Sequence, residues 1–84
     1  MKADQTESGR SYWLTKHARD QLSRRQIKKR EVEEVIDNHH LILPDKEKKE
    51  NQRFIGITAN GKELKLVVEK DSNPLKVITV IETS

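Results

Sequence analysis

The sequence predicts an α+β domain: a short N-terminal strand and two helices, packed on an antiparallel sheet of three to four strands. Two observations predict this class. Between residues 14 and 36, apolar side chains recur every three or four positions, which is the spacing of amphipathic helices. After residue 52 they recur at every second position, which is the spacing of strands. The 84 residues suffice for a single domain, which we place at residues 11–84.

The first half of this domain is expected to hold one strand and two helices. Residues 11–14 alternate in the manner of a short strand, and Thr15 is a suitable N-cap for a helix that runs to about Arg25. A second apolar period follows over 32–36, and we expect its helix to end near Asn38 because Pro44 forbids continuation. Residues 1–10 are polar and show no period, so a loose tail is expected there.

The second half is expected to be a meander. A short apolar piece at 41–43 could begin a strand, and the charged run 45–51 is an exposed loop. The strands that follow are predicted over Arg53–Thr58, Glu63–Lys70 and Leu75–Glu82.

Two turns join these three strands. Asn60-Gly61 is a strong hairpin signal and predicts a type I′ turn, which needs a positive φ at both residues. The segment 71–74 supplies the second turn. The core is expected to include seven side chains from the helices and strands: Leu22, Val32, Ile36, Leu64, Leu66, Ile78 and Val80.

Composition excludes several classes of protein. Cysteine is absent, which excludes disulfides, thiolate zinc sites and thiol nucleophiles. No apolar stretch approaches the roughly 20 residues of a membrane span, and the first ten residues lack the apolar region of a secretory signal. We therefore expect a soluble, cytoplasmic protein that does not contact membranes.

The charge is unevenly distributed. The net charge is +3, yet residues 31–84 hold eleven acids and eight bases, whereas residues 16–30 hold seven bases and one acid. Such a block indicates an anionic partner, either nucleic acid or an acidic protein, although a solvated helix face is the plain alternative. Its cations are Lys16, Arg19, Arg24, Arg25, Lys28, Lys29 and Arg30.

The stretch "KHARDQLSRRQIKKREVEEVI" resembles the N-terminal motif of the domain-of-unknown-function family 4258. His17-Ala18 match its opening, Arg25 and Ile27 its middle, and a Val-x-x-x-Ile helix its end. Further on, Arg53-Phe54, "ELKLVVE" and "VITV" are also similar to the family. The family resembles the RelE/ParE-like toxins. This resemblance implies a RelE-like fold, cleavage of RNA without a metal or other cofactor, and a protein antitoxin as partner.

The chain also departs from the family's pattern. Gln21 stands where the family often has arginine, Gln26 where it often has glycine, and Ile81 where an aromatic residue often closes the last strand. These departures are compatible with a weaker active site or with a non-enzymatic member.

RNA cleavage without metal needs groups that transfer protons and cations that stabilise the phosphate. His17 is the histidine beside the basic block, and it could transfer protons or, alternatively, serve as a structural histidine at the helix start. Arg25 could bind phosphate in bidentate fashion, or it could pair with Glu31 or Glu34 of the next helix.

Arg53 and Lys65 are the other candidate catalytic cations. They lie on strands joined by the Asn60-Gly61 turn and form a cationic platform if the register puts them on one sheet face. His39-His40 has no companion ligands at metal-site spacing, so we expect no metal there and favour a role at the helix C-terminus. Trp13 could stack on a base or pack in the core.

The sequence therefore favours a toxin-type endoribonuclease, or a relative that blocks translation, with RNA as substrate, including mRNA on the ribosome. The alternatives are a non-catalytic module that binds nucleic acid or protein through the same surface, and a ParE-like gyrase inhibitor.

Overall fold

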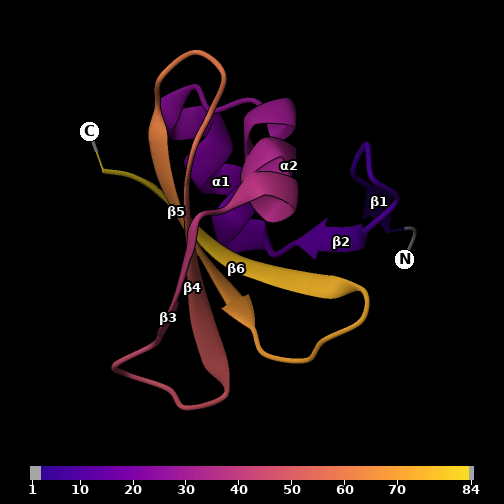
Figure 1. Ribbon diagram of the computed structural model, residues 1–84, viewed down its shortest axis with the longest axis vertical. Coiled ribbons are helices and arrows are strands. Elements are labelled where there is room, and N and C mark those ends of the chain that lie inside the picture. Colours follow the sequence, from indigo (N-terminus) through magenta and orange to yellow (C-terminus); the bar gives the residue numbers. More distant parts are fainter. Residues whose placement is uncertain (1–2, 84) are drawn as a thin grey trace.

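The computed structural model describes residues 3–83, which form two helices and a single six-stranded sheet (Figure 1). The spatial order of the strands is β1-β2-β6-β5-β4-β3. Along the chain the elements are β1 (Asp4–Gln5), β2 (Ser11–Leu14), α1 (Lys16–Arg25), α2 (Lys29–Asn38), β3 (Leu41–Pro44), β4 (Asn51–Ile57), β5 (Glu63–Glu69) and β6 (Leu75–Glu82).

The α+β class, both helices and the three long strands agree with the sequence prediction, but the sheet is larger than predicted and mixed. β2 runs parallel to β6, with Tyr12 opposite Leu75 and Leu14 opposite Val77. The other neighbouring strands are antiparallel. The apolar piece at 41–43 does begin a strand, β3, whereas β1 was not predicted because two residues are too few to show a period. Both short strands form by backbone pairing with their neighbours.

β1 differs from the expectation of a loose tail at residues 1–10. Asp4 and Gln5 pair with Tyr12 and Ser11 of β2, and Thr6 is buried. Residues 1 and 2 of that segment lie outside the described residues. The tail expectation rested on the lack of apolar residues, whereas backbone hydrogen bonds to β2 hold this strand.

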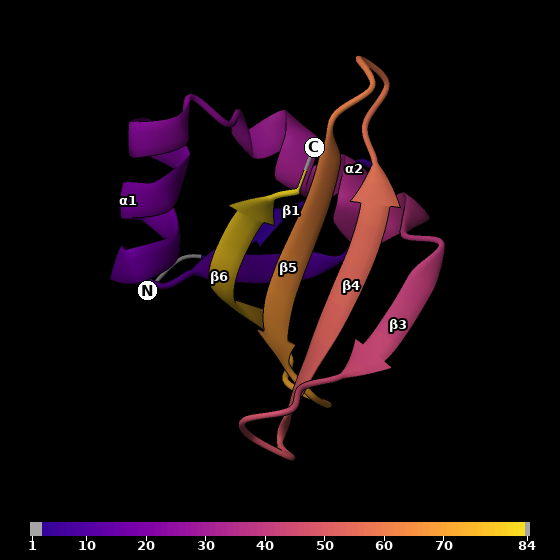
Figure 2. The ribbon, with the colours of Figure 1, turned by 90° about the vertical axis from the view of Figure 1, so that its left-hand side faces the viewer.

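Both helices lie on one side of the molecule, and the opposite face of β3–β6 is open (Figure 2). α1 lies against β6 and β2, and α2 lies against β4 and β5. Thr15 caps α1, as predicted, by accepting a hydrogen bond from Ala18 N–H at 3.1 Å. α2 begins after Lys28, whose backbone N–H donates to Glu31 Oε1 at 2.9 Å, so a carboxylate compensates for the poor N-cap residue.

The buried core lies between these helices and the sheet. Six of the seven predicted core residues are buried, and Ile78 is the exception because it is only half-buried. A bulge between Val67 and Val68 causes the error: Val68 pairs with Val77 and Val67 with Thr79, which leaves Ile78 between them. An extra residue shifts the alternation of side chains between the two faces of a strand by one position. Val77 is therefore buried in place of Ile78.

The β4–β5 hairpin turns at Asn60-Gly61, as predicted, but not as type I′. Gly61 has a φ of +87°, whereas Asn60 does not have a positive φ. The turn closes from Thr58 to Lys62, with Thr58 N–H donating to Lys62 O at 2.8 Å. In such a longer loop, only the last residue needs the left-handed conformation. The 71–74 turn also forms, with Asp71 at a φ of +61°.

Candidate functional site

A groove of about 600 Å³ opens on the uncovered sheet face, between the start of α1 and the loop that joins β3 to β4. Its floor comes from β5 and β6, and its far wall from residues 45–50. The lining residues are Thr15, His17, Asp45, Glu47, Lys48, Glu50, Asn51, Arg53, Val67, Glu69, Lys76, Ile78, Thr79 and Ile81.

The groove brings together two of the four candidate catalytic residues. His17 and Arg53 both line it, although 36 positions separate them in the sequence. Lys65 shares the open face with Arg53, because β4 pairs Arg53 with Val67 and Ile55 with Lys65, but it does not line the groove. Arg25 is exposed in the last turn of α1, also away from the groove. The register thus puts Arg53 and Lys65 on one sheet face, which is the condition for the predicted cationic platform.

His17 is exposed in the first turn of α1. Thr15, not His17, caps this helix, and no hydrogen bond of the His17 side chain occurs within residues 3–83. The alternative of a structural histidine that bonds the helix start thus has no counterpart in the described structure.

Arg53 is held by the loop. Its Nη2 donates to Asp45 Oδ1 at 3.1 Å, with 24% of the Arg53 side chain and 8% of the Asp45 side chain exposed. Desolvation opposes ionisation of Asp45, but hydrogen bonds from Glu47 N–H and from Arg53 outweigh it and lower the pKa of this carboxyl. The Arg53 Nε–H is buried without an acceptor within residues 3–83. This buried donor is thus one of the rare polar groups that burial leaves without a hydrogen bond.

The groove carries charges of both signs. Its cations are Lys48, Arg53 and Lys76, and the Lys76 ammonium also lies 5.6 Å from the centre of the half-buried Trp13 ring. Four carboxylates line the same space: Asp45, Glu47, Glu50 and Glu69. A phosphate would therefore meet repulsion as well as attraction here.

The predicted basic block forms a second, separate feature. All seven of its cations are exposed along α1, the α1–α2 junction and the start of α2. Among the described residues, Lys29 alone of the seven forms an ion pair, at 2.7 Å from Asp4. We call these seven residues the basic surface.

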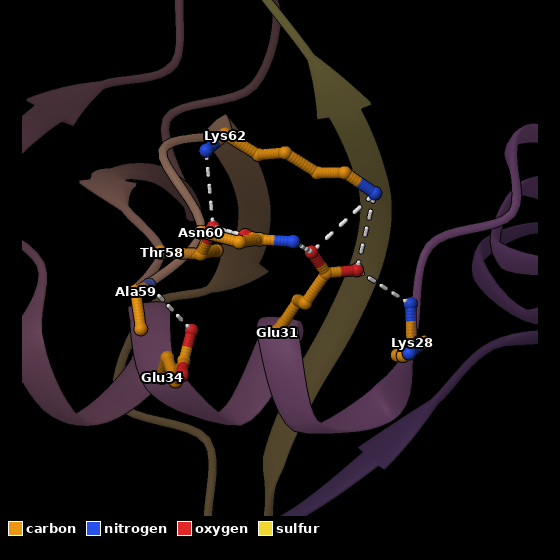
Figure 3. A network of polar contacts seen from close by, with 7 residues as sticks. All are labelled: Lys28, Glu31, Glu34, Thr58, Ala59, Asn60 and Lys62. Carbon is orange, nitrogen blue, oxygen red and sulfur yellow. Dashed lines mark hydrogen bonds and ion pairs between the residues drawn. The ribbon is translucent and has the colours of Figure 1, made fainter.

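The alternative pairing of Arg25 with Glu31 or Glu34 is wrong, because both carboxylates bind the β4–β5 hairpin (Figure 3). Glu31 is 4% exposed and accepts from Asn60 Nδ2 at 3.0 Å and Lys62 Nζ at 3.4 Å. Desolvation raises the pKa of Glu31, but the hydrogen bonds it accepts outweigh burial and lower it overall. Within residues 3–83, Arg25 forms no ion pair, so its guanidinium can meet a partner.

Gln21 has a structural role that sequence reasoning missed. β2 ends at Leu14, so beyond it the edge of β6 has no strand partner, and Gln21 Oε1 accepts from Val80 N–H at 2.8 Å. The residue that departs from the family's arginine thus satisfies a backbone donor of the sheet. Gln21 lies one helical turn after His17, and this spacing is the signal that could have placed Gln21 beside β6.

His39 has the predicted role at the end of α2. Its Nδ1 lies 3.1 Å from the carbonyl oxygens of Val35 and Ile36, and its ring stacks on Phe54 at 4.2 Å between centroids. Within residues 3–83, no three histidine or carboxylate side chains gather as a metal-binding group. Over the same residues, no helix is long and apolar enough to cross a membrane.

Comparison with known proteins gives one match. The model of the family described as a domain of unknown function (DUF4258) matches residues 14–82. No curated protein and no solved structure matches the chain.

Proposed function

We propose that this chain, which belongs to the DUF4258 family of domains of unknown function, binds RNA through its basic surface. The observation that carries the proposal is the set of seven exposed cations within fifteen residues, of which only Lys29 is paired within the described chain. Closely spaced and unpaired cations attract phosphates and release counterions from RNA on binding.

We also propose the wider relationship to the RelE/ParE-like toxins, which would make RNA, including ribosome-bound mRNA, the target and a protein antitoxin the partner. The order of elements supports it: a strand, two helices and an antiparallel meander, with both helices on one face.

The binding proposal is tested by the dependence of RNA affinity on salt. A single-stranded RNA oligonucleotide should bind with an affinity that falls steeply as salt rises, by a slope of about 0.7 per phosphate contacted. Reversal of charge at Arg24 and Arg25 should flatten this slope. The matched control reverses Lys46 and Lys49, which are exposed on the loop between β3 and β4 and do not line the groove. An unchanged slope in the Arg24/Arg25 variant would remove the basic surface from the RNA interface.

A second candidate function is RNA cleavage in the groove. The observation that favours it is that the side chains of His17 and Arg53 line the same groove. In this reaction His17 takes the proton of the 2′-OH while the 2′-oxygen attacks the phosphorus. The bond between phosphorus and the 5′-oxygen breaks, which leaves a 2′,3′-cyclic phosphate, and the 5′-oxygen takes a proton from water. Arg53, aided by Lys76, stabilises the charge on the phosphate. The groove carboxylates repel a phosphate, so RNA binding through the basic surface is the first candidate function and cleavage in the groove is the second.

A further inference from the structure

The open face of the sheet is unusually apolar at β3 and β4. An antiparallel sheet with one solvated face normally presents polar residues there. Here Leu41, Leu43 and Ile57 are 42%, 38% and 59% exposed. Together with the half-buried Ile55 and Val67 we call them the apolar patch.

Register places the members of this patch on the same face. Gly56 of β4 faces α2, because a Cβ built on it would lie 3.2 Å from Val35. Ile55 and Ile57 alternate with it and so face away from α2. Residues opposite one another share a face, and Leu41 lies opposite Ile55 while Leu43 lies opposite Arg53.

Lys65 lies between apolar neighbours on this face. It is half-buried, opposite Ile55 on β4 and Ile81 on β6. Within residues 3–83, Lys65 forms no ion pair. This part of the face therefore combines exposed aliphatic side chains with a lysine, and Glu63 lies on the same face at the edge of the patch, opposite Ile57.

We propose that the apolar patch docks an amphipathic helix of a partner protein, with a carboxylate on its apolar stripe that pairs with Lys65. The positive charge of Lys65 favours an acidic residue on the partner helix. The aliphatic side chains around Lys65 favour an apolar stripe on the same helix. The proposal is independent of RNA binding through the basic surface, with which the patch shares no residue, whereas Val67 of the patch also lines the groove.

Other occupants fit this surface less well. RNA bases stack on aromatic rings, and the patch contains none. An added strand needs edge donors, but β3 has four residues and ends at Pro44, which lacks an N–H. A symmetric contact with a second copy would bring Lys65 near its equivalent in the other copy. The apolar faces of α1 and α2 are already buried in the core, so neither helix is free to dock on another copy.

The experiment uses the whole chain, labelled for NMR, and two synthetic helical peptides. Both peptides carry a leucine stripe, and they differ only in a glutamate or a lysine at the centre of that stripe. The glutamate peptide should shift amide signals of β3, β4 and β5 and bind about fivefold or more tightly than the lysine peptide. Lys65→Glu should reverse this order, and Lys65→Met should abolish the preference. Lys70→Glu, an equal charge change at an exposed residue after β5, should preserve it.

The proposal fails if no signal of the patch shifts with either peptide. It also fails if the folded Lys65→Glu and Lys65→Met proteins keep the original preference for the glutamate peptide. Shifts of the patch with protein concentration alone would identify a second copy as the occupant. Shifts of the patch on addition of an RNA oligonucleotide would identify nucleic acid instead.

Discussion

Thr6 and Thr58 form the same turn on two different hairpins. The backbone N–H of each threonine donates to the carbonyl four residues later, at 2.9 Å to Arg10 and 2.8 Å to Lys62. The Oγ1 of each accepts from the N–H of that same later residue at 3.1 Å. In both turns a glycine with positive φ stands third after the threonine, so "TESGR" and "TANGK" are one structural motif.

Both turns bind carboxylates of α2. Thr6 and Ser8 donate to Asp37 at 2.8 and 2.6 Å, near the C-terminal end of the helix. Asn60 donates to Glu31 at 3.0 Å, near the other end. The two hairpins therefore hold α2 against the sheet from opposite ends, in addition to the apolar core.

Thr6→Val and Thr58→Val should each lower the free energy of unfolding by about 1–2 kcal/mol, because each removes a buried hydrogen-bonding hydroxyl and keeps its shape. Urea unfolding measures the loss. The double variant should show the sum of the two effects, since the turns share no partner. Thr79→Val is the matched control, because Thr79 lines the groove and forms no side-chain hydrogen bond within residues 3–83. A Thr79→Val loss as large as the others would contradict a special role for the turn hydroxyls.

Acid should remove the contribution of Glu31. Its folded pKa is lowered, so its stabilisation is present above the unfolded pKa of about 4.3 and is lost as pH falls through the folded pKa. Glu31→Gln should be less stable than the wild type at pH 7 by about 1–3 kcal/mol, and the difference should shrink towards pH 2. Urea unfolding at a series of pH values measures it, with the exposed Glu7→Gln as control. A difference that stays constant with pH would show that packing, not charge, explains the effect.

Gly61→Val should lower stability by about 1–3 kcal/mol, because a β-branched residue is strained at a φ of +87°. The space around Gly61 is open, since a Cβ there meets nothing within 4 Å. Backbone strain is thus the only source of the loss, and Gly61→Asn should cost less because asparagine tolerates the left-handed region. Thermal unfolding compares the two variants, and equal losses would argue against strain as the cause.

His17→Ala should reduce RNA cleavage by about 10²–10⁴-fold if the groove is catalytic, because it removes the proton-transfer group. Thermal unfolding should change little, since His17 is exposed, and RNA affinity should change little because His17 is not one of the seven cations of the basic surface. Total RNA profiles and growth after induction in a bacterium provide the measurement, with His40→Ala as the control. Full cleavage by folded His17→Ala would move the chemistry to Arg53 and Lys76. If the wild type cleaves no RNA, with or without ribosomes, RNA binding remains as the proposed function.

Local patterns in the sequence predicted most of the fold. The cap at Thr15, both helices, the meander and the position of the Gly61 turn follow from spacing and side-chain chemistry within a few residues. β1 and the burial of Val77 instead of Ile78 did not, because a two-residue strand and a one-residue bulge leave no period. The motif shared by Thr6 and Thr58 was present in the sequence as a repeated spacing of threonine, glycine and a basic residue.

By itself, the sequence determined where helices and strands form and that residues 16–30 present a basic surface, since both depend on neighbours along the chain. Only the tertiary structure decided which charges stay free. Glu31 binds the β4–β5 hairpin and Arg25 forms no ion pair within residues 3–83, whereas Asp45 binds Arg53. The packing of α1 on the sheet put His17 and Arg53 along one groove, and the register put Lys65 among aliphatic side chains. The physical reason is that a charged side chain pairs across elements according to register and approach, which no local spacing encodes.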